Sequence, residues 1–410
     1  MKEGPAPKFS PPKASIRNIF SRLPTSIWVL GFGSLFMDSS SELIHSLLPL
    51  FMTSVLGASM VVVGVIEGIA EATAAITKVF SGIISDYFKK RKLLVILGYG
   101  LAAVTKPLFP LATSIGWVFT ARFLDRIGKG IRGAPRDALV ADITPAELRG
   151  AAYGLRQSLD TVGAVIGPVL AVVLMVQFAN NIKTALWFAV IPAFITVLLL
   201  VIGIREPERG ERGLKHLAPL TFADIKRLSL RYWLIVLLGA VFTLARFSEA
   251  FLVLRARDVG LAIGYVPVVM IVMNLVYAFA AYPAGIASDR INPRSLLIAG
   301  LITLVASDLL LATAAAMPWQ VLAGAGLWGL HMGLTQGLFS KLLADAAPLG
   351  LRGTAFGVFN LVSGVALLLA STIAGLLWTL LGAPATFFAG AVFAGLTALG
   401  VMAYRPPRAT

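Results

Sequence analysis

Apolar segments of about 20 residues, the length that a helix needs to cross the hydrocarbon core of a bilayer, recur along the whole chain. In that core each segment has to satisfy its own backbone polar groups, which favours helices. We expect transmembrane helices near residues 27–56, 60–86, 93–112, 115–141, 151–178, 184–204, 232–257, 262–287, 295–316, 318–344, 354–381 and 384–403. With 58% hydrophobic and 13% charged residues, the composition is typical of such a protein. The sequence therefore predicts an all-α integral membrane protein with twelve spans.

The segments between these spans alternate in charge. One set is short and nearly uncharged: residues 57–59, 113–114, 317–318 and 382–383. The other set holds most basic residues outside the spans: residues 89–92, Arg149, the 205–231 segment, Arg290, Arg294, Arg352, Arg405 and Arg408. The positive-inside rule then places both termini in the cytoplasm and the chain in the cytoplasmic (inner) membrane. The rule also accounts for the net charge of +15, so no nucleic-acid partner is expected.

Two motifs recur at one displacement of 203 residues, which indicates an internal repeat. Gly82 and Asp86 return as Gly285 and Asp289, and Gly130 returns as Gly333. In the second motif, Asp142 and Arg149 return as Asp345 and Arg352. Duplicated halves of six helices are the architecture of many secondary transporters. We therefore divide the chain into a cytoplasmic tail (1–24), a six-helix bundle (25–204), a cytoplasmic linker (205–231), a second six-helix bundle (232–404) and a C-terminal tail (405–410).

The loop GIISDYFKKRK at residues 82–92, its partial copy at 285–294, Arg122 and the GAVIGP stretch at 163–168 resemble motifs of the major facilitator superfamily. The resemblance implies that superfamily's fold of two pseudo-symmetric six-helix bundles. Within the superfamily, the chain resembles proton-coupled efflux antiporters. It also implies a cytoplasmic gate in which Asp86 faces the arginine-rich region after the fourth span. The gate residues would be Gly82, Asp86, Arg136, Asp142, Arg149, Gly285, Asp289, Asp345 and Arg352. The alternative is that these basic residues only anchor the topology.

Gly163, Gly167 and Pro168 lie in the fifth span. Small residues let helices approach closely, and a proline bends a transmembrane helix. We expect these three residues to serve helix packing.

The fourth span carries seven charged residues: Arg122, Asp125, Arg126, Lys129, Arg132, Arg136 and Asp137. At roughly 100° per residue they fall within an arc of about 140° on one helix face. Such a face is not exposed to lipid. It faces water, partner charges or a substrate.

In the first span, Asp38, Glu42 and His45 share one helix face through their i, i+4, i+7 spacing. A carboxylate that binds and releases a proton in two conformations is the basic part of proton coupling. We assign this role to Asp38 and Glu42, with Arg122 and Asp125 beside them. Two alternatives stay open: static pairing of these acids with the fourth-span cations, and binding of a divalent transition metal by Asp38, Glu42 and His45.

The first half holds seven acids and eight bases in or near the membrane, so we expect a charge network in place of a purely cationic cavity. The second half is apolar by comparison. The residues expected to line the substrate cavity are His45, Glu67, Glu71, Arg126, Lys129, Asp160, Arg246, Glu249 and His331. Arg246 and Glu249, three residues apart, pair with each other in the alternative interpretation.

Three functions fit these residues: a proton-coupled exporter of a small molecule, a divalent transition-metal exporter, and an organic-anion uptake symporter. An enzyme is not expected, because the sequence has no Walker-type loop, no HExxH motif, no cysteine and only three histidines. Without an ATP-binding motif, the energy source should be an ion gradient. We expect protons, a small-molecule or ion substrate and the lipid bilayer as partners, no cofactor, and a monomer.

Overall fold

The computed structural model describes residues 22–88, 90–204, 228–315, 317–347 and 351–404, apart from the side chains of Asp86, Phe88, Asp289, Asp345, Arg352 and Gly353. The C-terminal tail, most of the predicted N-terminal tail and most of the predicted linker therefore lie outside the described residues. Within these ranges the regular structure is helical, with no β-strand, as predicted for an all-α protein.

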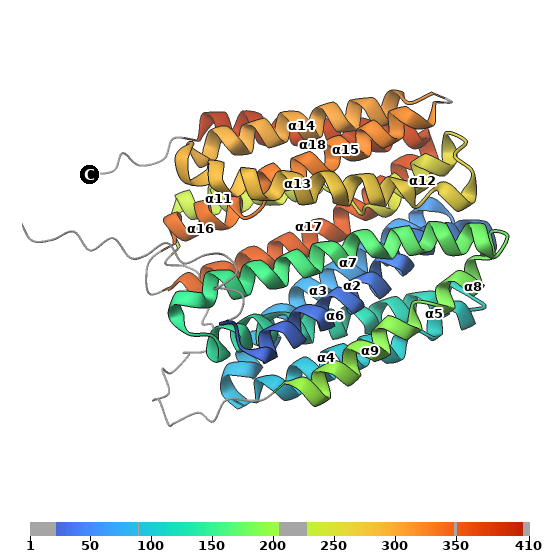
Figure 1. Cartoon of the computed structure of the whole chain (residues 1–410). Coiled ribbons are helices and arrows are strands. Elements are labelled where there is room, and N and C mark those ends of the chain that lie inside the picture. The colour runs from blue at the N-terminus through green and yellow to red at the C-terminus, as the bar shows by residue number, and fades with distance from the viewer. Residues whose placement is uncertain (1–21, 89, 205–227, 316, 348–350, 405–410) are drawn as a thin grey trace, which may run out of the picture.

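The first half of the chain forms one group of helices (Figure 1). Its elements are α2 (Thr25–Leu50), the π-helical η1 (Phe51–Val55), α3 (Met60–Phe88), α4 (Arg91–Thr105), α5 (Leu108–Leu111), α6 (Ile115–Ile143), the 3₁₀ turn η2 (Ala146–Leu148), α7 (Arg149–Gln177), α8 (Ile182–Trp187) and α9 (Val190–Gly203). The second half forms the other group. Its elements are α11 (Leu230–Leu244), α12 (Ala250–Asp258), the 3₁₀ turn η3 (Ile263–Tyr265), α13 (Val268–Arg290), α14 (Pro293–Thr313), α15 (Pro318–Thr335), α16 (Leu338–Ala346), α17 (Arg352–Leu381) and α18 (Ala383–Ala403).

Eight helical stretches in the described ranges are long and apolar enough to cross a membrane. The other four predicted spans correspond to α2, to α6 with its charged face, and to two pairs of shorter helices. The prediction of one continuous helix over 232–257 is wrong, because α11 ends at Leu244 and α12 begins at Ala250. The helix expected over 318–344 is also divided, at Gln336 and Gly337. Gly337 has a φ of +72°, which a residue without a Cβ adopts readily.

The two halves repeat the same packing. A Cβ on Gly130 of α6 would come within 2.5 Å of the Thr77 Cβ on α3. A Cβ on Gly333 of α15 would come within 2.7 Å of the Ala280 Cβ on α13. Thr77 and Ala280 are separated by the same 203 residues as the two glycines. The repeat in the sequence is therefore also a repeat of helix contacts.

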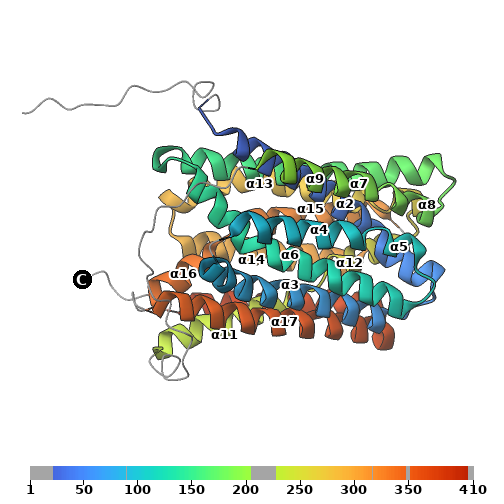
Figure 2. The same ribbon diagram turned by 90° about the horizontal axis from the view of Figure 1, so that it is seen from below.

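The halves meet through small residues. α3 and α17 lie side by side (Figure 2), and a Cβ on Gly64 would come within 2.1 Å of the Ser371 carbonyl oxygen. A Cβ on Gly375 would meet the Met60 carbonyl oxygen at 2.3 Å. Between α13 and α7, Asn274 Nδ2 donates a hydrogen bond of 2.9 Å to the Ala164 carbonyl. The two glycine contacts lie near the start of α3 and in the C-terminal half of α17, whereas Asn274 and Ala164 meet beside the cavities between the halves.

Candidate functional site

Two neighbouring cavities lie between the halves. The central cavity has a volume of about 450 Å³. The second has a volume of about 510 Å³ and lies nearer the end of the bundle at which the described chain begins (residue 22) and ends (residue 404). We call it the lower cavity. Both are lined by Glu42, Glu71, Lys129, Tyr277 and Leu367, so the two cavities adjoin at these residues.

Both halves of the chain line the central cavity. The charged or titratable lining residues are Glu42, His45, Glu71, Arg126, Lys129, Arg246 and Glu249, all of which the sequence placed at the site. Aromatic side chains cover much of the rest, among them Phe247, Tyr277 and Trp328. None of these three was predicted at the cavity from the sequence. Aromatic residues in membrane helices mostly pack between helices, so their identity alone gave no signal.

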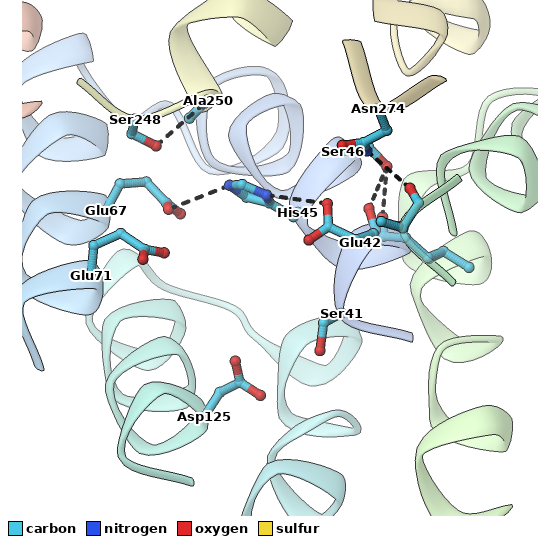
Figure 3. Close-up of polar contacts among 12 residues, drawn as sticks. Ser41, Glu42, His45, Ser46, Glu67, Glu71, Asp125, Ser248, Ala250 and Asn274 are labelled. Atoms are coloured by element: carbon cyan, nitrogen blue, oxygen red, sulfur yellow. Dashed lines mark hydrogen bonds and ion pairs between the residues drawn. The ribbon is translucent and has the colours of Figure 1, made fainter. Parts of the chain in front are cut away.

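His45 lies between two carboxylates, one at the cavity and one behind it (Figure 3). Its Nδ1 is 3.5 Å from Glu42 Oε2, and its Nε2 is 3.8 Å from Glu67 Oε2. Glu42 lines the cavity, whereas Glu67 is fully buried. The prediction that Glu67 lines the substrate cavity is therefore wrong, and His45 connects it to the cavity instead.

Two ion pairs are buried behind the cavity wall. Arg122 Nη2 donates to Glu67 Oε2 at 2.7 Å. Lys106 Nζ donates to Asp125 Oδ1 at 2.9 Å and to the Ser41 hydroxyl at 3.0 Å. All four charged side chains are at most 5% exposed, so the fourth-span charges Arg122 and Asp125 have partners in α3 and α4. Neither residue lines either cavity or contacts Asp38, with which the sequence analysis grouped them.

The charges nearest the cavity are paired more loosely. Arg126 Nη1 is 3.3 Å from Glu71 Oε1, and both side chains line the central cavity. Lys129 lines both cavities and has no ion-pair partner among the residues that the structure describes. Asp38, which lines the lower cavity, also has no ion-pair partner among the described residues.

Linked charges form one part of the wall of the lower cavity. Asp160 Oδ2 accepts a hydrogen bond of 2.6 Å from Arg156 Nη1 and lies 4.0 Å from Arg136 Nη1. Arg136 also donates to the Ser34 hydroxyl at 3.0 Å and to the Tyr99 hydroxyl at 3.2 Å. Arg132 holds its guanidinium 4.5 Å from the centre of the Tyr99 ring. Asp160, predicted at the substrate cavity, therefore lies in this lower part.

The expected gate is only partly visible. Asp142 pairs with Arg91 at 2.6 Å, and Arg149 Nε donates to the Ala141 carbonyl at 3.2 Å. Gly82 and Gly285 lie in the last turns of α3 and α13. Arg136, one of the predicted gate residues, donates to the Ser34 and Tyr99 hydroxyls. The gate stays a prediction, because its other side chains lie outside the described residues: Asp86, Asp289, Asp345 and Arg352.

No group of three or more histidine, aspartate or glutamate side chains in the described ranges is arranged to hold a metal ion. His45 reaches Glu42 and Glu67, while Asp38 lies one turn away in the lower cavity. The ligand set Asp38, Glu42 and His45 is therefore not assembled in this structure.

The second half contributes fewer charges, and they are isolated. Arg246 and Glu249 lie within the break between α11 and α12 and line the central cavity, and no ion pair joins them. His331 is fully buried, with Nδ1 2.8 Å from the Gly300 carbonyl oxygen, and it lines neither cavity, contrary to the prediction. Asp308 of α14 is also fully buried, and neither of its carboxyl oxygens has a hydrogen-bond partner in the described part of the chain.

Gly163 and Gly167 place α7 directly against α2. A Cβ on Gly163 would come within 2.5 Å of the Leu35 carbonyl oxygen. A Cβ on Gly167 would come within 2.7 Å of the Glu42 Cβ. Pro168 follows inside α7, which continues to Gln177. The close approach of these helices holds Glu42 at the cavity wall.

A model of the family described as Major Facilitator Superfamily matches residues 30–255 and 249–410. An MFS-type transporter of Methanocaldococcus jannaschii is 33% identical over 386 residues, which cover 92% of this chain and 94% of the relative. The solved nucleoside transporter NupG has a TM-score of 0.76 at 13% identity, covering 92% of this chain and 99% of its own. A D-xylose–proton symporter has a TM-score of 0.72 at 16% identity, covering 93% of this chain and 97% of its own.

Proposed function

The chain belongs to the major facilitator superfamily, and from this premise we propose that it is a proton-coupled antiporter that exports a small molecule by alternating access. Membership makes the protein a secondary active transporter with many membrane-spanning helices, and not an enzyme. The predicted family and two-half fold are thus confirmed. The coupling ion, the direction and the substrate are the content of the proposal.

The observation that carries proton coupling is the chain of titratable groups Glu42, His45 and Glu67. Because the two ring nitrogens of His45 face different carboxylates, one imidazole links the cavity to the buried Glu67–Arg122 pair. Asp38 lies in the lower cavity without a cation partner among the described residues, so a proton is a ready counter-charge for it. Intramembrane acids of this kind form the proton relays of many transporters.

The charge distribution of the loops supports an orientation with both termini in the cytoplasm of a cell bounded by this inner membrane. In that orientation the lower cavity lies on the cytoplasmic side of the central cavity. The contacts from Gly64 to Ser371 and from Gly375 to Met60 then lie on the opposite side. Substrate from the cytoplasm would enter through the lower cavity, as export requires. A single chain supplies both cavity walls, so we propose a monomer as the working unit.

The two other functions find less support. A transition-metal exporter lacks an assembled ligand set in the described residues. Uptake of an organic anion is favoured by the unpaired cations Lys129 and Arg246. However, three carboxylates, Glu42, Glu71 and Glu249, line the same cavity and would repel a purely anionic substrate.

The experiment is transport in proteoliposomes that contain a trapped pH dye, screened with amino acids, drugs, metal ions and organic anions. We expect a substrate whose addition moves protons in the opposite direction. Asp38→Asn and Glu42→Gln should abolish this proton movement and the accumulation driven by a pH gradient, while substrate-for-substrate exchange continues. Glu147→Gln removes an exposed carboxylate outside the cavities and is the matched control. Accumulation that survives both substitutions and the collapse of the gradient would rule out the proposal.

A further inference from the structure

Arg246 and Glu249 differ from the other charges of the central cavity. In the first half, each carboxylate that lines this cavity has a basic side chain within 4 Å: the His45 imidazole for Glu42 and the Arg126 guanidinium for Glu71. Arg246 and Glu249 line the cavity with no ion-pair partner among the described residues. Both side chains are half-buried, where an unpaired charge is costly. Two opposite charges left unpaired in one cavity indicate that a ligand supplies their partners.

The break between α11 and α12 keeps these two charges apart. The Arg246 guanidinium lies 5.5 Å from the centre of the Phe242 ring in α11. The Ser248 backbone N–H donates to the Ser371 hydroxyl of α17 at 3.1 Å, which anchors the segment between the two helices. Glu249 directly precedes α12. In a continuous helix, residues three apart would face each other and pair, whereas here each charge faces the cavity separately.

We propose that the central cavity binds a small zwitterion, whose carboxylate pairs with Arg246 and whose ammonium group pairs with Glu249. The inference rests on the proposed function, because it takes this cavity to be the substrate site. Phe247 and Trp328, whose ring centres are 5.3 Å apart, cover the same cavity and offer an apolar surface to the rest of the molecule. A cavity of about 450 Å³ is within the range that holds small molecules.

Lys129 is the remaining unpaired cation of the central cavity. It lies where the two cavities join and shares both with Glu42 and Glu71. Within the first half, the two carboxylates Glu42 and Glu71 balance the two cations Arg126 and Lys129, so the two unpaired charges of the second half set the preference. A ligand with one charge of either sign would leave Arg246 or Glu249 buried and unmatched.

The test is binding to the purified full-length protein in detergent, measured by calorimetry with matched ligands. Glycine, leucine and phenylalanine are each offered as the zwitterion, as the cationic amide and as the anionic N-acetyl derivative. We expect at least one zwitterion to bind about tenfold or more tightly than both of its singly charged derivatives. If none of the nine compounds binds, or if the amide or the N-acetyl form binds as well as the zwitterion, the proposal is wrong.

Two substitutions separate the roles of the charges. In Arg246→Gln the zwitterion should lose its advantage over the amide, and in Glu249→Gln it should lose its advantage over the N-acetyl form. Arg231→Gln and Asp258→Asn are controls outside the cavity and should leave both preferences unchanged. A general loss of binding with the charge preference retained would contradict the assignment. The calorimetry in detergent involves no ion gradient, so it tests binding separately from coupling. A zwitterion that binds in detergent but shows no proton-coupled movement in vesicles would refute only the proposed coupling.

Discussion

α6 and α15 occupy equivalent places in the two halves, yet their inward faces have opposite character. Where α6 carries Asp125 and Lys129, α15 carries Trp328 and Met332 at positions 203 residues later. Both helices pack through a glycine against the equivalent neighbouring helix. The fold therefore does not require charge at these positions. We therefore propose that the charges of the first half serve transport, while the half that lacks them shows what the scaffold alone needs.

The two halves also differ in how they treat a buried carboxyl group. Glu67 in the first half is fully buried and pairs with Arg122 at 2.7 Å. Asp308 in the second half is fully buried and has no partner among the described residues. Replacement of Glu67 by a neutral residue leaves the Arg122 guanidinium unpaired, whereas replacement of Asp308 leaves no cation unpaired. The same substitution should therefore have different consequences in the two halves.

The largest effect is expected for Glu67→Gln. The neutral amide leaves Arg122 as an uncompensated charge in a site where its side chain is 1% exposed. Loss of one partner of a buried ion pair costs about 3–5 kcal/mol. We expect a destabilisation of that size, measured by equilibrium unfolding in mixed micelles.

The control replaces both partners. Glu67→Leu combined with Arg122→Leu removes the pair without leaving a lone charge, so it should unfold at a higher denaturant concentration than Glu67→Gln. Glu147→Gln, in an exposed turn, should stay within about 0.5 kcal/mol of the wild type. A double variant as unstable as Glu67→Gln would show that packing, and not charge, makes this site sensitive.

A smaller effect, similar in both halves, is expected for Gly130→Ala and Gly333→Ala. The added Cβ would approach Thr77 to 2.5 Å in one case and Ala280 to 2.7 Å in the other, so the helices have to move apart. Overpacking of this kind costs about 1–3 kcal/mol. The measurement is the same unfolding series, with Gly100→Ala as the control because a Cβ there meets no atom within 4 Å. Costs that differ strongly between the two glycines would contradict the equivalence of the halves.

The sequence predicted the spans, the repeat and the charged face of α6, because each follows from periodicity along one chain. It did not predict the partners of those charges. Lys106 pairs with Asp125 and Arg122 with Glu67 because α3 and α4 turn particular faces toward α6, and the rotation of a helix is set by its packing. His331 was misplaced for the same reason.

The break between α11 and α12 was also missed. Residues 245–249 contain no proline or glycine, so no local signal marks the end of α11. The break is held by a distant contact, from the Ser248 N–H to Ser371 in α17. The break before α16 did carry a signal in Gly337, but glycines are frequent in membrane helices and one alone is ambiguous.

The smallest effect is expected for Asp308→Asn, which makes the same change from carboxyl to amide at an equally buried site. An ionised carboxylate without a partner would be very costly there, so we expect the group to be neutral in the folded protein. An amide of nearly the same shape then replaces a neutral acid, and the free energy of unfolding should change by less than about 1 kcal/mol. The measurement is the unfolding series used for Glu67→Gln.

Asp308→Asn and Glu67→Gln are matched in chemistry and burial, so their difference isolates the effect of the cation partner. A loss of more than about 2 kcal/mol for Asp308→Asn would mean that this carboxyl has a charged or hydrogen-bonded partner in the folded protein. Gly390 bears on the same question, because a Cβ there would come within 2.6 Å of Asp308 Oδ2 and 3.0 Å of Phe247. The carboxyl group thus fills the space that this glycine leaves beside a cavity-lining ring. If Asp308→Asn changes the free energy of unfolding only slightly, the shape of this side chain, and not its charge, determines which residue the position accepts.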